Sequence, residues 1–342
     1  MGVEKPVGEN TSDEVKISML FEEYLEELRL IERQYGQEEA LYPLVYMILK
    51  DSLKKNKNGN TQDLSMMHVP TAKSAKTLAG RELIKGYVGF PDLAIFSKDF
   101  RVVKDDGEDF QNIKHIYGCA EIKGLGDLLC DFGSIEEIKL IKRNNENKEQ
   151  LDTENPTNQN NVNATSDSKD SPDQISLQIN DRSEILFYKT YDKQKKKNIM
   201  KMEPAGQLLG ELLWYGRVIY TNGLQWKYLE VTECQWMESS KVKETLEALR
   251  NLLYERCVKY EDDKWYEKFI DLQKNNDLKI TIRCAEIGNL EDAYKKYKSN
   301  KIEEKNDEKM TKKNSMEWIE LKSWDNLLAN LKKINWTGTT KF

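Results

Sequence analysis

The sequence predicts an α/β fold in which helices flank a central mixed β-sheet. Apolar residues at helical spacing alternate along the chain with short apolar runs bounded by glycine and polar residues, a pattern that indicates alternating helices and strands. The expected order is helices, a pair of strands, a helix, a second pair of strands and further helices. Only 38% of the residues are hydrophobic, but 7 Trp, 16 Tyr and 9 Phe supply the bulky side chains that a core requires.

The composition excludes several classes of protein. The chain of 342 residues has a net charge of −6, whereas a protein that coats nucleic acid without specificity is usually basic. Its five cysteines form no CxxC pair and only two histidines are present, so neither a disulfide framework nor a multi-histidine zinc site is indicated. No segment approaches the ~20 apolar residues of a membrane span, and the first residues lack the pattern of a signal peptide. We therefore expect a cytoplasmic protein with reduced thiols and no membrane partner.

The first elements are expected to be helical. Residues 18–34 are rich in Leu, Ile and Glu, and residues 37–54 carry apolar side chains at helical spacing between Leu41 and Leu49. We assign residues 1–36 to an N-terminal helical segment. The polar residues that follow the second helix are expected to form loop or mixed structure as far as Lys76.

Two strands are expected next, paired in antiparallel fashion. The apolar run 86–96 and the run 115–123 have the composition of strands, and the charged residues 98–112 between them are typical of a turn region. Residues 144–173 consist mainly of Asn, Asp, Ser, Thr, Glu and Lys and have almost nothing to bury. We therefore expect a disordered insertion at 144–173.

A helix and further strands complete the expected core domain, which we place at residues 37–235. Residues 203–215 carry the leucine stripe of a helix, and Asn222-Gly223 is a strong hairpin signal between two apolar runs. The expected strands lie at 176–179, 184–190, 217–221 and 225–231.

Residues 236–342 are expected to form a mainly helical C-terminal region. The expected helices lie at 242–260, 265–273 and 290–297. A charged linker is predicted at 301–314. Residues 316–336 carry Trp and Leu at helical spacing, so this tail is expected to dock on the body. The sequence leaves open whether the region packs on the core, forms a homodimer or binds a protein partner.

Two carboxylates and a lysine are expected to meet at the ends of the first pair of strands. Asp92 follows Pro91 where one strand begins, and Glu121-Ile122-Lys123 ends the next. Side chains alternate between the two faces of a sheet, so Glu121 and Lys123 share a face that Asp92 can reach. Converging carboxylates suit a hard cation such as Mg²⁺, with Mn²⁺ as a substitute. An adjacent lysine can position a water molecule and stabilise developing charge.

This pattern of Pro-Asp, spacer and Glu-x-Lys resembles the signature of the PD-(D/E)xK nuclease superfamily. Three further features follow the order found in type I restriction-enzyme nuclease domains. They are an acidic pair (Glu38, Glu39) at the start of a helix, Gln207 on a later helix, and the strand, Thr-Asn-Gly, Trp, strand run at 217–228. The resemblance covers roughly residues 37–233. The spacer between the two carboxylates is long, and the insertion interrupts the region beyond the lysine.

The resemblance implies a restriction endonuclease-like core and a role for each matching residue. Asp92 and Glu121 become metal ligands, and the backbone carbonyl of Ile122 supplies a third. Lys123 becomes the catalytic lysine. Gln207 becomes a residue that orients the metal site or a phosphate.

An auxiliary acid is expected from Glu38 or Glu39. Glu38 shares a helical face with Leu41 and Val45, which directs it towards the core and favours it over Glu39. The alternative for both residues is a purely structural role, as negative charges stabilised by the dipole at a helix N-terminus.

A run of lysines precedes the helix that carries Gln207. These lysines either contact phosphates near the active site or form the solvated tip of a hairpin. The run comprises Lys193, Lys195, Lys196 and Lys197.

The resemblance predicts a metal-dependent nuclease that hydrolyses phosphodiester bonds, with DNA favoured over RNA as the substrate. Its expected setting is microbial or phage defence, counter-defence or DNA processing. The alternative is a catalytically inactive module that retains the nuclease fold and binds DNA or a partner protein.

Overall fold

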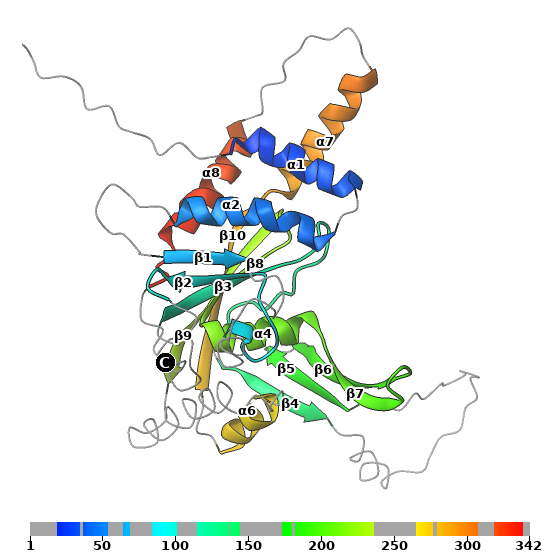
Figure 1. Ribbon diagram of the computed structural model, residues 1–342, viewed down its shortest axis with the longest axis vertical. Helices are drawn as coiled ribbons and strands as arrows, with labels where there is room; N and C mark the ends of the chain where they lie inside the picture. The colour runs from blue at the N-terminus through cyan, green and yellow to red at the C-terminus, as the bar shows by residue number, and fades with distance from the viewer. Residues whose placement is uncertain are drawn as a thin grey trace, which may run out of the picture.

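The fold is a mixed α/β structure organised around a six-stranded sheet (Figure 1). The computed structural model describes residues 19–34, 37–53, 64–68, 84–100, 115–135, 137–143, 173–179, 182–235, 265–275, 279–306 and 318–337. The sheet has the order β1-β2-β3-β8-β9-β10. Its strands are β1 (Leu64–His68), β2 (Leu93–Ser97), β3 (Ile116–Ile122), β8 (Arg217–Thr221), β9 (Gln225–Gln235) and β10 (Lys279–Asn289). Among the described strands only β3 and β8 pair in parallel, so the predicted mixed sheet and its antiparallel β2–β3 pair are confirmed.

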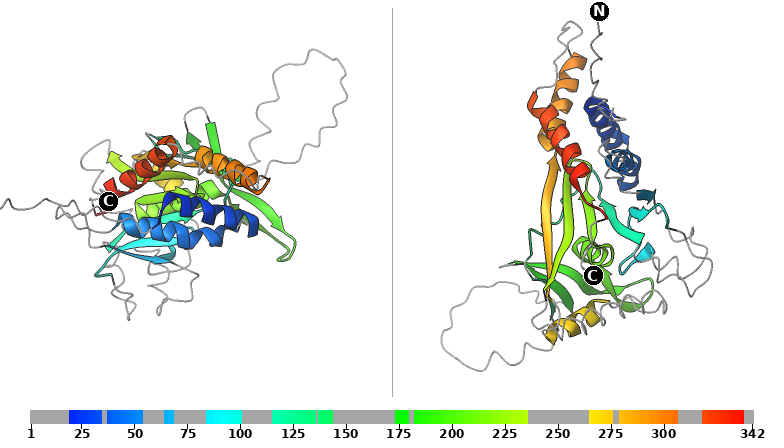
Figure 2. Two further views of the ribbon diagram at one scale, coloured as in Figure 1. Left: turned by 90° about the horizontal axis from the view of Figure 1, so that it is seen from above. Right: turned by 90° about the vertical axis from the view of Figure 1, so that its left-hand side faces the viewer.

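Helices from both ends of the chain cover one face of this sheet, as the two views in Figure 2 show. Their apolar side chains form one buried cluster with the strands. Each of these helices buries one apolar face there, which accounts for the apolar residues at helical spacing in the N-terminal segment and in the tail. These elements are α1 (Phe21–Gln34), the short 3-10 helix η1 (Glu38–Leu41), α2 (Tyr42–Ser52), α7 (Glu291–Asn306) and α8 (Trp318–Lys333).

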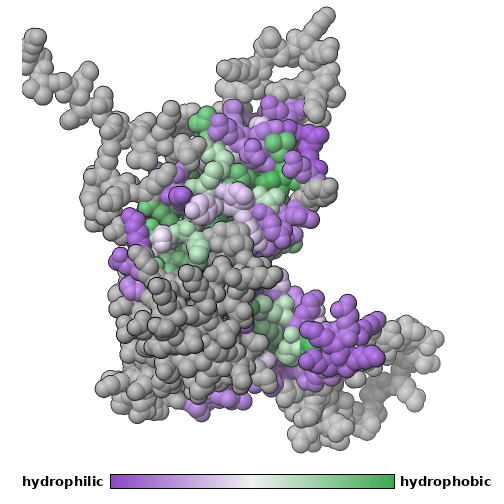
Figure 3. Space-filling view, viewed as in Figure 1, coloured by the Kyte–Doolittle hydropathy of each residue, from purple (hydrophilic) through white to green (hydrophobic). Residues whose placement is uncertain are grey.

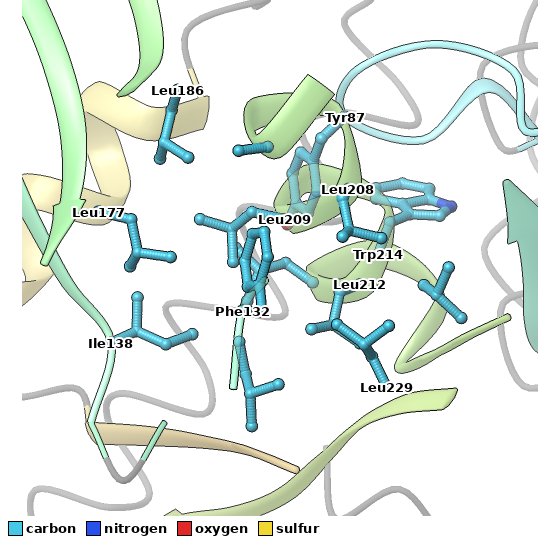
Figure 4. Packing of buried hydrophobic residues seen from close by; sticks show 14 of the residues in the cluster. Tyr87, Phe132, Ile138, Leu177, Leu186, Leu208, Leu209, Leu212, Trp214 and Leu229 are labelled. Carbon is cyan, nitrogen blue, oxygen red and sulfur yellow. The ribbon is translucent and has the colours of Figure 1, made fainter. Parts of the chain in front are cut away.

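Helix α4 (Pro204–Tyr215) covers the opposite face and separates it from a second, four-stranded antiparallel sheet. In the buried cluster shown in Figure 4, Leu209 of α4 lies towards Leu177 of that sheet, whereas Leu208 lies on the side of Trp214. Helix α6 (Trp265–Lys274) packs against the same cluster. The strands of the second sheet are β4 (Lys139–Arg143), β5 (Gln174–Ile179), β6 (Arg182–Asp192) and β7 (Lys197–Met202).

The expected docking of the C-terminal tail is confirmed. The ring of Trp324 on α8 stacks on that of Phe21 on α1 at 5.2 Å between centroids. Beyond α8, Trp336 is buried against β3, where a Cβ at Gly118 would lie 2.5 Å from its ring. The guanidinium of Arg217 donates a hydrogen bond to the carbonyl oxygen of Trp336 at 2.9 Å. The tail therefore completes the cluster on this face of the sheet.

The mainly helical region expected after residue 235 contributes a strand to the central sheet. Strand β10 pairs with β9 along almost its whole length, from Lys279 opposite Gln235 to Asn289 opposite Gln225. Strand β1 likewise lies where loop or mixed structure was expected. These residues belong to the same sheet as the core, so the boundary at 235/236 does not divide the fold.

The strand expected at 86–96 begins only at Leu93. Gly86 and Gly89 have positive φ angles of 65° and 152°, conformations that a strand does not contain, and Pro91 follows them. The segment before β2 is therefore a turn, and Asp92 is the last residue before the strand. Helix α7 also runs further than expected, to Asn306, into the predicted charged linker.

Two sequence predictions, the insertion at 144–173 and the helix at 242–260, lie outside the described residues. Among the helices that the structure describes, none combines the length and the apolar character needed to cross a bilayer.

Candidate active site

Asp92 and Glu121 lie opposite each other on neighbouring strands. In the antiparallel β2–β3 pair Leu93 is opposite Ala120, and the register therefore places Asp92 opposite Glu121 on the face that α4 covers. The backbone amide of Ile122 donates a hydrogen bond to Oδ2 of Asp92 at 2.7 Å. The convergence of the two carboxylates that the sequence predicts is thus present.

Lys123 and Gln207 both bind the carboxylate of Glu121. The Lys123 Nζ lies 2.5 Å from Oε1 of Glu121, and Nε2 of Gln207 donates to the same oxygen at 2.7 Å. Gln207 reaches this position from the first turns of α4. The sequence-predicted set of Asp92, Glu121, Lys123 and Gln207 therefore forms one cluster from β2, β3 and α4.

Lys123 is held in place by the end of β8 and the turn that follows it. Its backbone amide donates to the carbonyl of Thr221 at 2.8 Å, which extends the parallel β3–β8 pairing by one bond. The side-chain amide of Asn222 donates to the carbonyl of Asp127 at 2.8 Å, and the Asp127 carboxylate accepts from the Gly124 amide at 3.0 Å. The Thr-Asn-Gly run therefore fixes the turn that follows the lysine.

Glu38, and not Glu39, faces the cluster. Glu38 is half-buried on η1 and its Oε1 accepts a hydrogen bond of 3.0 Å from the hydroxyl of Tyr42. The charge of Glu38 also contributes to raising the pKa of Asp92. Glu39 is exposed.

Two members of the cluster were not identified from the sequence. The Tyr42 hydroxyl lies between Glu38 and Asp92 and interacts with both carboxylates. Glu211 is 1% exposed, and its Oε1 accepts a hydrogen bond of 3.3 Å from Nε2 of Gln207. A helical spacing of four residues relates Tyr42 to Glu38 and Glu211 to Gln207, and this spacing was the available signal.

Burial and mutual repulsion raise the pKa values of the carboxyl groups. Burial raises the pKa of Asp92 to about 7; the charge of Glu121 adds to this rise, and hydrogen bonds from Tyr42 and the Ile122 amide oppose it. Burial also raises the pKa of Glu121, against the opposing effect of Lys123. Burial, followed by the charge of Glu121, raises the pKa of Glu211 well above its usual value. The cluster therefore favours bound protons or a cation near neutral pH.

The lysine remains charged in this setting. Burial favours the neutral amine, but the charge of Glu121 and the hydrogen bond to it outweigh burial, so the pKa of Lys123 is raised.

The donor set fits a hard divalent cation. Oε2 of Glu121, whose carboxylate lies opposite Asp92, and Oε2 of Glu211 are both buried with no other hydrogen-bond partner among the described residues, and the two carboxyl groups interact with each other. A shared proton or a bound cation would satisfy these oxygens. Within the described part of the chain, no group of three or more His, Cys, Asp or Glu side chains is arranged as a metal site. Mg²⁺ is commonly held by one or two carboxylates with water and substrate phosphate, so a pair is sufficient. The Ile122 side chain is buried on the opposite face of the sheet, and only its backbone adjoins this pair.

The predicted lysine run lies apart from the cluster. Lys193, Lys195 and Lys196 are exposed in the turn between β6 and β7, and Lys197 is exposed at the first position of β7. Five further strand residues separate Lys197 from the end of β7, which is about 17 Å at ~3.3 Å per residue. The run lies at the exposed tip of a hairpin and is not part of the cluster, and its contact with phosphates stays a prediction.

Comparison of the chain with protein-family models, with curated proteins and with solved structures finds no match.

Proposed function

We propose that the chain is a metal-dependent nuclease with a restriction endonuclease-like core. The observation that carries this proposal is the convergence of Asp92, Glu121 and Lys123 beside Gln207, because these are the residue types and the order that the PD-(D/E)xK resemblance requires. The favoured substrate is DNA. A setting in microbial or phage defence, counter-defence or DNA processing belongs to the same proposal, as does assembly with a second copy or a protein partner.

Asp92 and Glu121 would hold Mg²⁺ or Mn²⁺, with the Ile122 carbonyl as a third oxygen ligand. Such an ion lowers the pKa of a bound water molecule and neutralises charge on a phosphodiester. The Lys123 ammonium would orient the attacking water and stabilise the charge that develops on the phosphate.

The remaining residues of the cluster position these groups. Gln207 donates to Glu121 and to Glu211, so it fixes the orientation of the first carboxylate against the helix. Tyr42 links Glu38 to Asp92 on the other side of the cluster. Both contacts restrict the rotamers of the proposed metal ligands before the ion binds.

Cleavage assays on single- and double-stranded DNA and RNA test the proposal, with Mg²⁺, with Mn²⁺ and with EDTA. Asp92→Ala and Lys123→Ala should each abolish metal-dependent cleavage. Asp99→Ala and Lys98→Ala are matched controls, because both residues are exposed at the far end of β2. Absence of cleavage on every substrate, together with absence of Mn²⁺ binding by calorimetry, would overturn the proposal.

The alternative is a catalytically inactive module that binds DNA or a partner protein. It is favoured by one feature of the cluster, the ion pair in which Lys123 already occupies an oxygen of Glu121. A module of this kind requires no affinity for Mn²⁺, so calorimetry distinguishes it from the nuclease.

A further inference from the structure

The β6–β7 arm, residues 188–202, concentrates positive charge in an acidic chain. It contains six lysines and one aspartate, a net charge of +5, whereas the whole chain has a net charge of −6. The lysines of this segment are Lys189, Lys193, Lys195, Lys196, Lys197 and Lys201. The remainder of the chain therefore has a net charge of −11, and the arm is a local exception to it.

The arm projects from the body and is accessible. Strand β7 forms one edge of the second sheet, and Figure 1 shows the end of β6 and β7 extending away from α4. Figure 3 shows hydrophilic residues gathered on the lobe that projects beside the main body. All six lysines are exposed, and Lys189 forms an ion pair of 3.1 Å with Asp173. The large apolar side chains exposed on the arm are those of Tyr191 and Met200, too few for an apolar protein interface.

The turn at the end of the arm has a defined conformation. Oδ1 of Asp192 accepts hydrogen bonds from the backbone amides of Gln194 (2.9 Å) and Lys195 (3.0 Å). Lys196 follows with a φ of 50° and leads directly into β7. The single aspartate of the arm is thus used to shape the turn, and the lysine side chains around it are presented to solvent.

We propose that the β6–β7 arm binds the phosphate backbone of duplex DNA while the scissile phosphate lies at the Asp92–Glu121 pair. The placement of the scissile phosphate at the Asp92–Glu121 pair rests on the proposed function. The binding of phosphates by the arm does not. Strand β7 leads through Glu203 directly into α4, which carries Gln207, so the arm adjoins the helix that contributes to the cluster.

The length of the arm favours a duplex over a single strand. From Lys197 to Met202 the strand spans about 17 Å, and duplex DNA presents one phosphate charge per ~1.7 Å of axis. About ten phosphates lie along that length, twice as many as one strand offers at ~3.4 Å per charge. Lys197 and Lys201 project from the same face of the β6–β7 pair, and Lys189 projects from the other face. These two lysines and those of the turn can contact phosphates along a duplex without any base contact, which predicts binding independent of sequence.

The salt dependence of binding measures these contacts. Affinity for a duplex of about 30 base pairs and for a single strand of the same length is measured by fluorescence anisotropy in EDTA, across a range of NaCl concentrations. Each phosphate contact contributes about 0.9 to the slope of log K against log [NaCl] on duplex DNA and about 0.7 on a single strand. A variant with Gln at Lys193, Lys195, Lys196 and Lys197 should lose about 3 to 4 from the duplex slope.

A variant with four exposed lysines replaced elsewhere controls for net charge. Gln at Lys274, Lys295, Lys322 and Lys333 removes the same charge from α6, α7 and α8. This control should keep the wild-type slope to within about one contact. Circular dichroism and thermal melting establish that both variants are folded.

The results distinguish the arm from the nuclease site, because binding in EDTA does not require cleavage. If the slope of log K against log [NaCl] on duplex DNA is equal in the arm variant and the control, the proposal is overturned, even if the wild-type protein cleaves DNA. An acidic protein would then be the partner of the arm. A larger loss on single-stranded than on duplex DNA also overturns it. A reduced duplex slope in a protein that cleaves nothing supports the arm and favours the binding module over the nuclease.

Discussion

Replacing Asp92 with asparagine should stabilise the protein in the absence of divalent cations. Asp92 is largely buried beside Glu121, and burial together with the charge of Glu121 raises its pKa from 3.8 to about 7. Ionised Asp92 therefore destabilises the folded state relative to the unfolded chain. The asparagine side chain is neutral at every pH, and its carbonyl oxygen can still accept the hydrogen bond from the Ile122 amide.

The size of the effect follows from the two pKa values. Each unit corresponds to about 1.4 kcal/mol, so ionising Asp92 in the folded protein costs about 4 kcal/mol at pH 8. At pH 5 Asp92 is protonated in the folded protein and largely ionised in the unfolded chain. The loss of folding stability due to this group is then about 2 kcal/mol. Wild-type stability therefore decreases between about pH 4 and pH 7 as far as this group is concerned, and the advantage of Asp92→Asn increases over the same range.

Urea denaturation in EDTA at pH 5 and at pH 8 measures both values. Asp99→Asn is the control, because Asp99 is exposed at the other end of β2 and should change stability little at either pH. The reasoning is refuted if Asp92→Asn is no more stable than wild type at pH 8, or if its advantage is greater at pH 5 than at pH 8.

Three further predictions concern the same site and the packing behind it. Saturating Mg²⁺ or Mn²⁺ at about 100 times its Kd should raise wild-type stability by about 2.7 kcal/mol, measured by thermal melting, and should leave Asp92→Asn unchanged; equal shifts would place the ion elsewhere. Tyr42→Phe should weaken Mn²⁺ affinity about tenfold by calorimetry, because it removes the hydroxyl between Glu38 and Asp92, whereas Tyr46→Phe one turn later should not. Gly118→Ala should destabilise the fold by roughly 1 to 3 kcal/mol in urea, because its Cβ would clash with the Trp336 ring, and an unchanged midpoint would contradict that packing.

The central part of the fold was predictable because its signals are local. The leucine stripe of α4 and the Asn222-Gly223 turn between β8 and β9 each specify an element within a short window. Strand β10 also has a local signal, since Ile280 and Ile282 alternate with polar residues. Its partner β9 is more than forty residues away, and nothing in the window identifies that pairing. The sequence therefore predicts a helical region where the structure has this strand.

The candidate site divides in the same way. Asp92, Glu121 and Lys123 were found because they sit at strand ends, where alternation decides which side chains share a face. The sequence does not identify Glu211, because a glutamate on a helix is usually solvated and only the packing of α4 between two sheets buries it. Its position follows from tertiary structure.

In the proposed nuclease, the cluster and the arm would compensate for two electrostatic features of the chain. Buried carboxylates such as Glu121 and Glu211 destabilise the fold, and the body that surrounds them is acidic, so the protein without the arm would repel a polyanion. A divalent cation would neutralise the pair at the site, and the lysines of the arm supply attraction about 17 Å along β7 from the helix that bears Gln207. Neither feature alone would account for the proposed nuclease activity. A cation at the cluster without the arm would bind one phosphate but would not hold the rest of the DNA. The arm without the cation would bring a phosphate to a site whose negative charge is not neutralised.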